Sequence, residues 1–145
     1  MLVILLSETV VTSLKRLEKY KFKAKFEGEN FPELLVDEPS PIGEGAGPRP
    51  TQLLSAAVGH CLSSSLIFCL KKARIAVEAL DTTLRTEVSR NEMGRLEVKS
   101  IEAKIHLSVS DEDRVRLPTC LKVFENYCTV TQSVRRGIPV KVSFV

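Results

Sequence analysis

The sequence contains no tryptophan, few aromatic residues and little net charge. Aromatic residues make up 6% of its 145 residues, and 21 basic against 18 acidic residues leave a formal charge of only +3. Nucleic-acid-binding proteins usually carry a concentrated basic stripe with stacking aromatics. The notable basic pairs here are only Lys71 with Lys72 and Arg135 with Arg136, so we do not expect a nucleic-acid partner.

Closely spaced cysteines are also missing. Successive cysteines lie 8, 51 and 8 positions apart along the chain. The four cysteines are Cys61, Cys69, Cys120 and Cys128. A structural zinc site needs close pairs such as Cys-x2-Cys, and the two histidines, His60 and His106, do not form a ligand pair. The sequence therefore predicts no metal site.

The first residues do not resemble an export signal. Residues 1–6 are apolar, but no basic leader and no small-residue cleavage site accompany them. We therefore expect a cytoplasmic location. In that reducing compartment structural disulfides are rare, and cysteines are more often core residues, metal ligands or redox groups.

Length and composition indicate one globular domain over residues 1–145. A chain of this length buries enough apolar surface to fold without disulfides or a metal. Hydrophobic residues make up 43% and charged residues 27% of the sequence, which is close to ordinary soluble usage.

The N-terminal third shows a hairpin followed by a loop. Apolar and lysine residues alternate over residues 20–26, which predicts a strand. A turn at residues 28–30 can return the chain as a second strand over residues 31–36. Residues 1–19 fit a helix about as well as a coil, and the prolines and glycines of residues 37–50 predict a loop.

A long apolar helix is predicted from Thr51 to Lys72, with Pro50 at its start. Residues 53–70 carry no charge, so a membrane-spanning helix is an alternative. The run contains four serines, Gly59 and His60, and amphipathic strands are predicted on both sides of it. These features argue against a membrane-spanning helix, so we expect no membrane partner. A helix that is apolar nearly all round is otherwise a central one.

The second half predicts a strand hairpin and then short helices. Alternation over residues 80–88 and 96–109 indicates two long strands, with a bulge near residues 99–101 because the parity of the second strand changes there. Ser110 is a candidate N-cap for a helix. An apolar stripe over residues 117–128 follows, and Pro118 must break or kink the helix that carries it.

The chain is predicted to end with a helix and a strand. The helix covers residues 131–136 and stops at Gly137, and the strand covers residues 140–144.

Three segments occur in a recognisable order. They are Gly47-Pro48-Arg49-Pro50-Thr51-Gln52-Leu53-Leu54, then Ala56-Ala57-Val58-Gly59-His60-Cys61-Leu62, and later Tyr127-Cys128-Thr129-Val130-Thr131-Gln132-Ser133-Val134. This order resembles the OsmC/Ohr family, whose members carry a Gly-Pro-x-Pro-x-Glu-Leu-Leu segment, a Gly-x-Cys on a central helix and a second cysteine before the final strand.

The resemblance implies an OsmC-like α+β fold, in which antiparallel sheets wrap around central helices in an interleaved homodimer. It also implies a cysteine peroxidase that reduces organic hydroperoxides, with Cys61 peroxidatic and Cys128 resolving. An external dithiol would recycle the enzyme, and no cofactor is expected. Cys69 and Cys120 match no family motif, so we interpret them as buried core residues.

Two departures from the family pattern keep an alternative open. Gln52 stands where the family has a glutamate, and lysines stand where the peroxidase branch has an arginine in the N-terminal strand. Gln52 and Arg49 are predicted to support the thiol site, although Arg135 or Arg136 could supply the cation instead. The alternative is a non-catalytic relative that binds small ligands or senses oxidants in the interface cleft.

Overall fold

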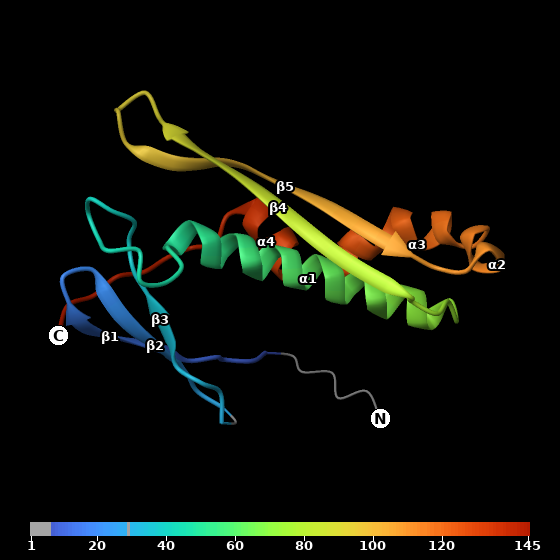
Figure 1. Cartoon of the computed structure of the whole chain (residues 1–145), viewed down its shortest axis with the longest axis horizontal. Coiled ribbons are helices and arrows are strands. Elements are labelled where there is room, and N and C mark those ends of the chain that lie inside the picture. Colours follow the sequence, from blue (N-terminus) through green and yellow to red (C-terminus); the bar gives the residue numbers. More distant parts are fainter. Residues whose placement is uncertain (1–6, 29) are drawn as a thin grey trace. The chain divides into compact units, whose positions relative to one another are not determined.

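The computed structural model describes residues 7–28 and 30–145 and has an α+β architecture (Figure 1). Its elements are β1 (Thr12–Glu18), β2 (Lys21–Phe26), β3 (Leu34–Val36), α1 (Pro50–Lys72), β4 (Ala79–Arg90), β5 (Leu96–Ser108), α2 (Asp111–Arg114), α3 (Leu117–Val123), the 3-10 helix η1 (Phe124–Tyr127) and α4 (Thr129–Arg136). The chain divides into two compact units, Met1–Leu53 and Leu54–Val145. That a single domain covers the chain stays a prediction.

The N-terminal unit contains a three-stranded antiparallel sheet in the order β1-β2-β3. The predicted hairpin of β2 and β3 is confirmed, with Phe22 opposite Val36. Residues 12–18 form a strand, so the helix-or-coil interpretation of this segment was wrong. All seven residues of β1 are exposed, so the strand has no buried face that an alternating sequence pattern could reveal. The strand is held by its pairing with β2. The apolar residues 1–6 lie outside the described residues.

A buried carboxylate organises the loop that follows β3. Asp37 accepts hydrogen bonds from the backbone N–H groups of Glu38, Glu44 and Ala46. Burial alone would raise the pKa of Asp37, but these hydrogen bonds outweigh burial and lower it. Gly47 then passes so close to β3 that a Cβ atom would lie 2.1 Å from the Leu35 carbonyl oxygen. These contacts therefore fix the conformation of the loop that leads into α1.

The C-terminal unit is built on α1 and the β4–β5 hairpin, which runs along the helix (Figure 1). A Cβ atom on Gly59 would lie 2.4 Å from a methyl carbon of Leu84, so a glycine is needed at this close approach. Ser63 and Thr82 hydroxyls are 2.7 Å apart across the same contact. The predicted bulge is confirmed, because Glu87 pairs with Ser100 and Val88 with Val98, which leaves Lys99 unpaired.

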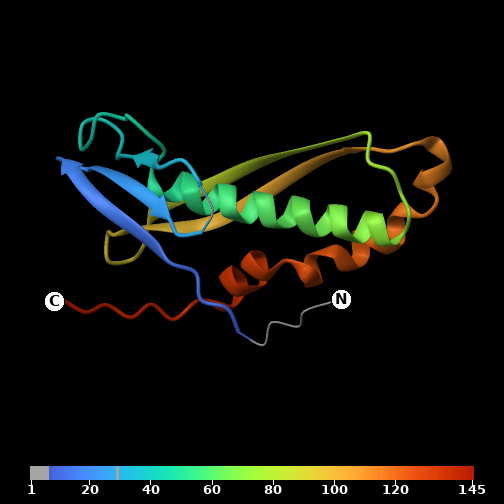
Figure 2. The ribbon, with the colours of Figure 1, turned by 90° about the horizontal axis from the view of Figure 1, so that it is seen from below.

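The segment from α2 to α4 runs back along α1 in the opposite direction (Figure 2). Ser110 caps α2 by accepting a hydrogen bond from the Asp113 N–H, as the sequence predicts. Pro118 lies in the first turn of α3, and the apolar stripe over residues 117–128 is divided between α3 and η1. Helix α4 ends at Gly137, which has a positive φ of 78°.

Buried residues from α1 and this returning segment form the core, and Leu66, Leu70 and Cys128 are fully buried. By length and composition alone α1 could span a membrane. Its packing against the hairpin and the returning segment is that of a core helix.

The predicted final strand was wrong. Residues 138–145 pair with no strand in the part of the chain that the structure describes, and Phe144 is 97% exposed. A strand needs a hydrogen-bonding partner as well as an alternating pattern.

Candidate active site

Cys61 lies in the middle of α1, with its sulfur at the N-terminus of α4. The Val130 backbone N–H donates a hydrogen bond to Cys61 Sγ over 3.4 Å. Val130 belongs to the first turn of α4, where N–H groups have no partner inside the helix. The cap residue Cys128 provides no side-chain hydrogen bond to these groups. The Cys61 sulfur thus takes the place of a capping oxygen.

These contacts favour the thiolate of Cys61. Burial by itself would raise the pKa of Cys61, but hydrogen bonds from the Cys128 thiol, the Val130 and Thr131 N–H groups and the Ser65 hydroxyl outweigh it and lower the pKa below its usual value. A thiolate near a helix N-terminus is also stabilised by the helix dipole. Cys61 is half-buried, so its sulfur keeps some access to solvent.

Cys128 has the opposite character. It is fully buried, and its Sγ is hydrogen-bonded to the Thr131 hydroxyl over 2.8 Å. Burial raises the pKa of Cys128, and its hydrogen bond to Cys61 raises it further, because the proton is retained next to a developing thiolate. One thiol of the pair is therefore poised to ionise first, and its neighbour remains protonated.

The structure therefore brings together the two cysteines that the sequence predicts to react. Both are free thiols, the Cys61 sulfur accepts the N–H of Val130 two residues after Cys128, and each thiol shifts the pKa of the other. An activated thiolate beside a second thiol can attack an electrophile and then close a disulfide. Their assignment as peroxidatic and resolving residues stays a prediction.

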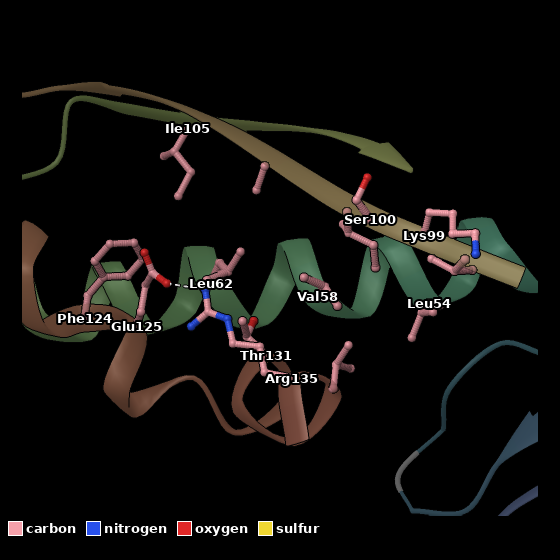
Figure 3. Close-up of a pocket in the computed structure, with 14 residues that line it drawn as sticks. Leu54, Val58, Leu62, Lys99, Ser100, Ile105, Phe124, Glu125, Thr131 and Arg135 are labelled. Carbon is pink, nitrogen blue, oxygen red and sulfur yellow. Dashed lines mark hydrogen bonds and ion pairs between the residues drawn. The ribbon is translucent and has the colours of Figure 1, made fainter. Parts of the chain in front are cut away.

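A cavity of about 510 Å³ lies between β5, η1 and α4, with α1 as one wall (Figure 3). Apolar side chains from α1 and β5 line much of it, including Val58, Leu62 and Ile105. Thr131, which is bonded to Cys128, also lines it. The ion pair of Arg135 with Glu125, 2.5 Å apart, supplies charge at the same cavity. Its size suits a small organic molecule.

The predicted supporting residues belong to the N-terminal unit. The Gln52 side chain accepts a hydrogen bond from the Arg49 backbone N–H over 3.1 Å, and the Gln52 N–H donates to the Arg49 carbonyl. This is half of a capping box at the start of α1. Both residues line a hollow of that unit. Their support of the thiol site stays a prediction.

The lysines of β2 make ion pairs within the same unit. Lys21 pairs with Glu18 and Glu44, and Lys23 pairs with Glu33. Hydrogen bonds to Glu44 and Glu18 raise the pKa of Lys21.

Sequence reasoning missed the groups that hold the Cys61 sulfur. Ser65 lies one helical turn after Cys61, and this i, i+4 spacing could have identified it. Val130 and Thr131 act through backbone N–H groups, which leave no mark in residue identity. Within residues 7–28 and 30–145, no three His, Cys, Asp or Glu side chains gather where they could hold a metal ion.

The comparisons with known proteins agree on one family. The family model described as OsmC-like protein matches residues 43–143. An OsmC-like protein of unknown function from Vibrio cholerae has a similar structure, with a TM-score of 0.75, 14% identity, and 88% of this chain and 94% of that chain covered. A hypothetical protein from Aquifex aeolicus gives a TM-score of 0.69 at 23% identity, with 90% of each chain covered.

A third similar structure is an organic hydroperoxide resistance protein OsmC from Legionella pneumophila. Its TM-score is 0.69 at 14% identity, with 88% of this chain and 90% of that chain covered. A search of curated proteins finds no match. At these identities the structures establish the fold, and the family model covers more than half of the sequence. The chain therefore belongs to the OsmC-like family.

Proposed function

We propose that this protein is a thiol peroxidase that reduces organic hydroperoxides. The observation that carries the proposal is the position of the Cys61 sulfur, which accepts the Val130 N–H at the start of α4 and has the Cys128 thiol beside it. Membership of the OsmC-like family and likeness to a hydroperoxide resistance protein support the same chemistry.

In the proposed cycle the Cys61 thiolate attacks one oxygen of the peroxide O–O bond. The alcohol leaves after taking up a proton, and Cys61 becomes a sulfenic acid. The Cys128 sulfur then attacks the Cys61 sulfur, so a disulfide forms and water leaves. An external dithiol reduces this disulfide through a mixed disulfide and regenerates both thiols.

The cavity beside Thr131 supports an organic rather than an inorganic substrate. Its apolar walls offer burial to a hydrocarbon group, while hydrogen peroxide has no such group to bury. The hydroxyl of Thr131 connects the cavity to Cys128. We therefore assign the cavity to the organic part of the hydroperoxide.

We also propose that the working protein is a cytoplasmic homodimer. One face of α1 is exposed in the single chain, over Ala56, Ala57, His60, Ser64 and Phe68. The apolar segment 138–145 is exposed as well and lacks a strand partner within the described chain. Both features favour cover by a second copy. Light scattering at micromolar concentration should give twice the chain mass, and a stable monomer would contradict the proposal.

The function is tested by following consumption of cumene hydroperoxide with dithiothreitol as the dithiol. We expect many turnovers per protein chain, and we expect Cys61→Ser to reduce them to the uncatalysed rate. Hydrogen peroxide at the same concentration is the comparison substrate, and it should be consumed more slowly because it cannot use the apolar cavity.

The same assay separates catalysis from the alternative function. A binding or oxidant-sensing protein would consume at most one equivalent of hydroperoxide per chain and then stop, even with dithiothreitol in excess. Such a result would contradict the peroxidase proposal.

A further inference from the structure

The two remaining cysteines form a second close pair. Cys69 Sγ lies 3.9 Å from the Cys120 carbonyl oxygen and donates a weak hydrogen bond to it. The neighbouring Cys69 thiol also contributes to raising the pKa of Cys120. Cys69 on α1 is half-buried, and Cys120 on α3 is only 3% exposed. Cys120 is a core residue, as expected, and Cys69 packs against that core and beside Cys120.

Antiparallel packing explains why the cysteines meet in two pairs. Cys61 and Cys69 are eight positions apart on α1, and Cys120 and Cys128 are eight positions apart on the returning segment. Because that segment runs against α1, the first cysteine of one meets the last cysteine of the other. Eight residues of helix span about 12 Å, so the two pairs cannot exchange partners directly.

We propose that Cys69 and Cys120 form a second redox site, a dithiol that closes to a disulfide when the pool of low-molecular-weight thiols becomes oxidised. The oxidant is a small disulfide. Cys69, the more exposed thiol, attacks it as the thiolate, forms a mixed disulfide and releases one small thiolate. The Cys120 thiolate then attacks the Cys69 sulfur and releases the second. One small disulfide is thus reduced to two thiols, and one protein disulfide forms.

The surroundings of this pair favour a slow but lasting disulfide. Burial and the neighbouring Cys69 thiol together raise the pKa of Cys120 to about 11, and among the groups acting on it only the Arg116 guanidinium lowers this pKa. A thiol that is rarely ionised attacks slowly. Because the surroundings of Cys120 favour its thiol over its thiolate, the reduced pair lacks the thiolate stabilisation of strongly oxidising dithiols, and the disulfide resists reduction once it has formed.

Closure would join α1 to the segment that carries Cys128. The bond would link helices whose contact otherwise consists of packing and the hydrogen bonds from Arg116 to the Ala73 and Arg74 carbonyls. It would fix the chain eight residues before Cys128 and enclose the whole β4–β5 hairpin in a covalent loop. A loop of this length constrains the unfolded chain strongly, so oxidation should raise the thermal stability.

The test uses a Cys61→Ser/Cys128→Ser variant, which retains only the second pair, equilibrated with glutathione disulfide. We expect an intramolecular disulfide between Cys69 and Cys120 by peptide mapping, and a Tm higher by about 5 °C or more than that of the reduced sample. Adding Cys120→Ser should stop the reaction at glutathione on Cys69. No hydroperoxide is present, so this result does not depend on the peroxidase proposal.

Mapping of the unmutated protein after the same treatment guards against a variant that fails to fold. A Cys69–Cys120 peptide in that sample supports the second site. The proposal is overturned if the folded protein keeps glutathione on Cys69 while Cys120 still alkylates on unfolding, or if both thiols remain free after equilibration.

Discussion

The two cysteine pairs occupy equivalent positions along the contact between α1 and the returning segment, yet they meet opposite backbone groups. At one position Cys61 faces N–H groups of α4 and accepts the Val130 N–H. At the other, Cys69 faces a carbonyl oxygen and donates to it. N–H groups stabilise a thiolate, whereas a carbonyl oxygen stabilises only the protonated thiol.

The comparison shows how local secondary structure distinguishes two chemically identical pairs. Cys128 immediately precedes a helix, so unpaired N–H groups point at its partner. Cys120 lies inside α3, where its N–H is not available to a neighbour and burial dominates. Fast peroxide chemistry is therefore expected at Cys61 and slow exchange at Cys69.

The largest expected effect comes from removing either sulfur of the Cys61–Cys128 pair. Cys61→Ser should abolish peroxidase turnover because no other thiolate is held by α4. Cys128→Ser should allow one oxidation, which then stalls at sulfenic acid or proceeds to sulfinic acid. Mass spectrometry after one equivalent of hydroperoxide, beside the steady-state rate, measures both outcomes.

Cys69→Ala is the matched control in the same helix, and it should leave turnover unchanged. If Cys69→Ala removed turnover from a protein that remained folded by circular dichroism, the assignment of the two pairs would be wrong.

A smaller effect is expected from one hydrogen bond to the Cys61 sulfur. Ser65→Ala removes a donor that lowers the pKa of Cys61, so this pKa should rise. The thiolate is present above the pKa and is lost as the pH falls through it. Iodoacetamide labelling of Cys61 should therefore shift to higher pH and slow by about 3- to 10-fold at pH values below the pKa.

Ser64→Ala is the control for that measurement, because Ser64 is adjacent but exposed. Its labelling curve should match that of the unmutated protein. An unchanged curve in Ser65→Ala would show that the backbone N–H groups alone hold the sulfur.

A substitution in the cavity wall tests whether the cavity binds the organic group of the substrate, independently of thiol reactivity. Ala103→Leu places a larger side chain on β5 in the cavity wall. We expect kcat/KM for cumene hydroperoxide to fall by about 10-fold, in line with the 1–3 kcal/mol that pocket shape usually contributes. The rate with hydrogen peroxide should change little, and an equal loss for both substrates would place the organic group elsewhere.

The sequence predicts those parts of the fold in which a residue type or an apolar pattern depends directly on the backbone conformation. The parity change near Lys99 indicated the bulge, and Gly137 marked the end of α4. The strand Thr12–Glu18 was missed because none of its residues is buried, so its pattern records no core face. The strand predicted over residues 140–144 failed for the converse reason, since alternation was present but a partner strand was not.

The candidate site was predictable only in part. The order of motifs around Cys61 and Cys128 indicated the pair, and the structure brings their thiols together. Cys69 meets Cys120 because the two segments pack antiparallel. The equal spacing of eight residues on both segments predicts this pair only once that packing is known. The contacts of the Val130 and Thr131 backbone could not be predicted, because a backbone donor is the same for every residue except proline.

The smallest expected effect concerns Gln52, which lies outside both cysteine pairs. Gln52→Glu keeps the oxygen that accepts the Arg49 N–H and adds negative charge at the helix N-terminus, so stability should rise by about 0.5 kcal/mol. Gln52→Ala loses the acceptor and should lower stability by a similar amount. If Gln52 supports the thiol site, as the family resemblance implies, Gln52→Glu should also shift the Cys61 labelling curve to higher pH, because an added carboxylate can neutralise a cation that favours the thiolate. Urea unfolding and iodoacetamide labelling on the same samples measure the two effects. An unchanged curve in Gln52→Glu would contradict that support and leave position 52 with the capping of α1 alone.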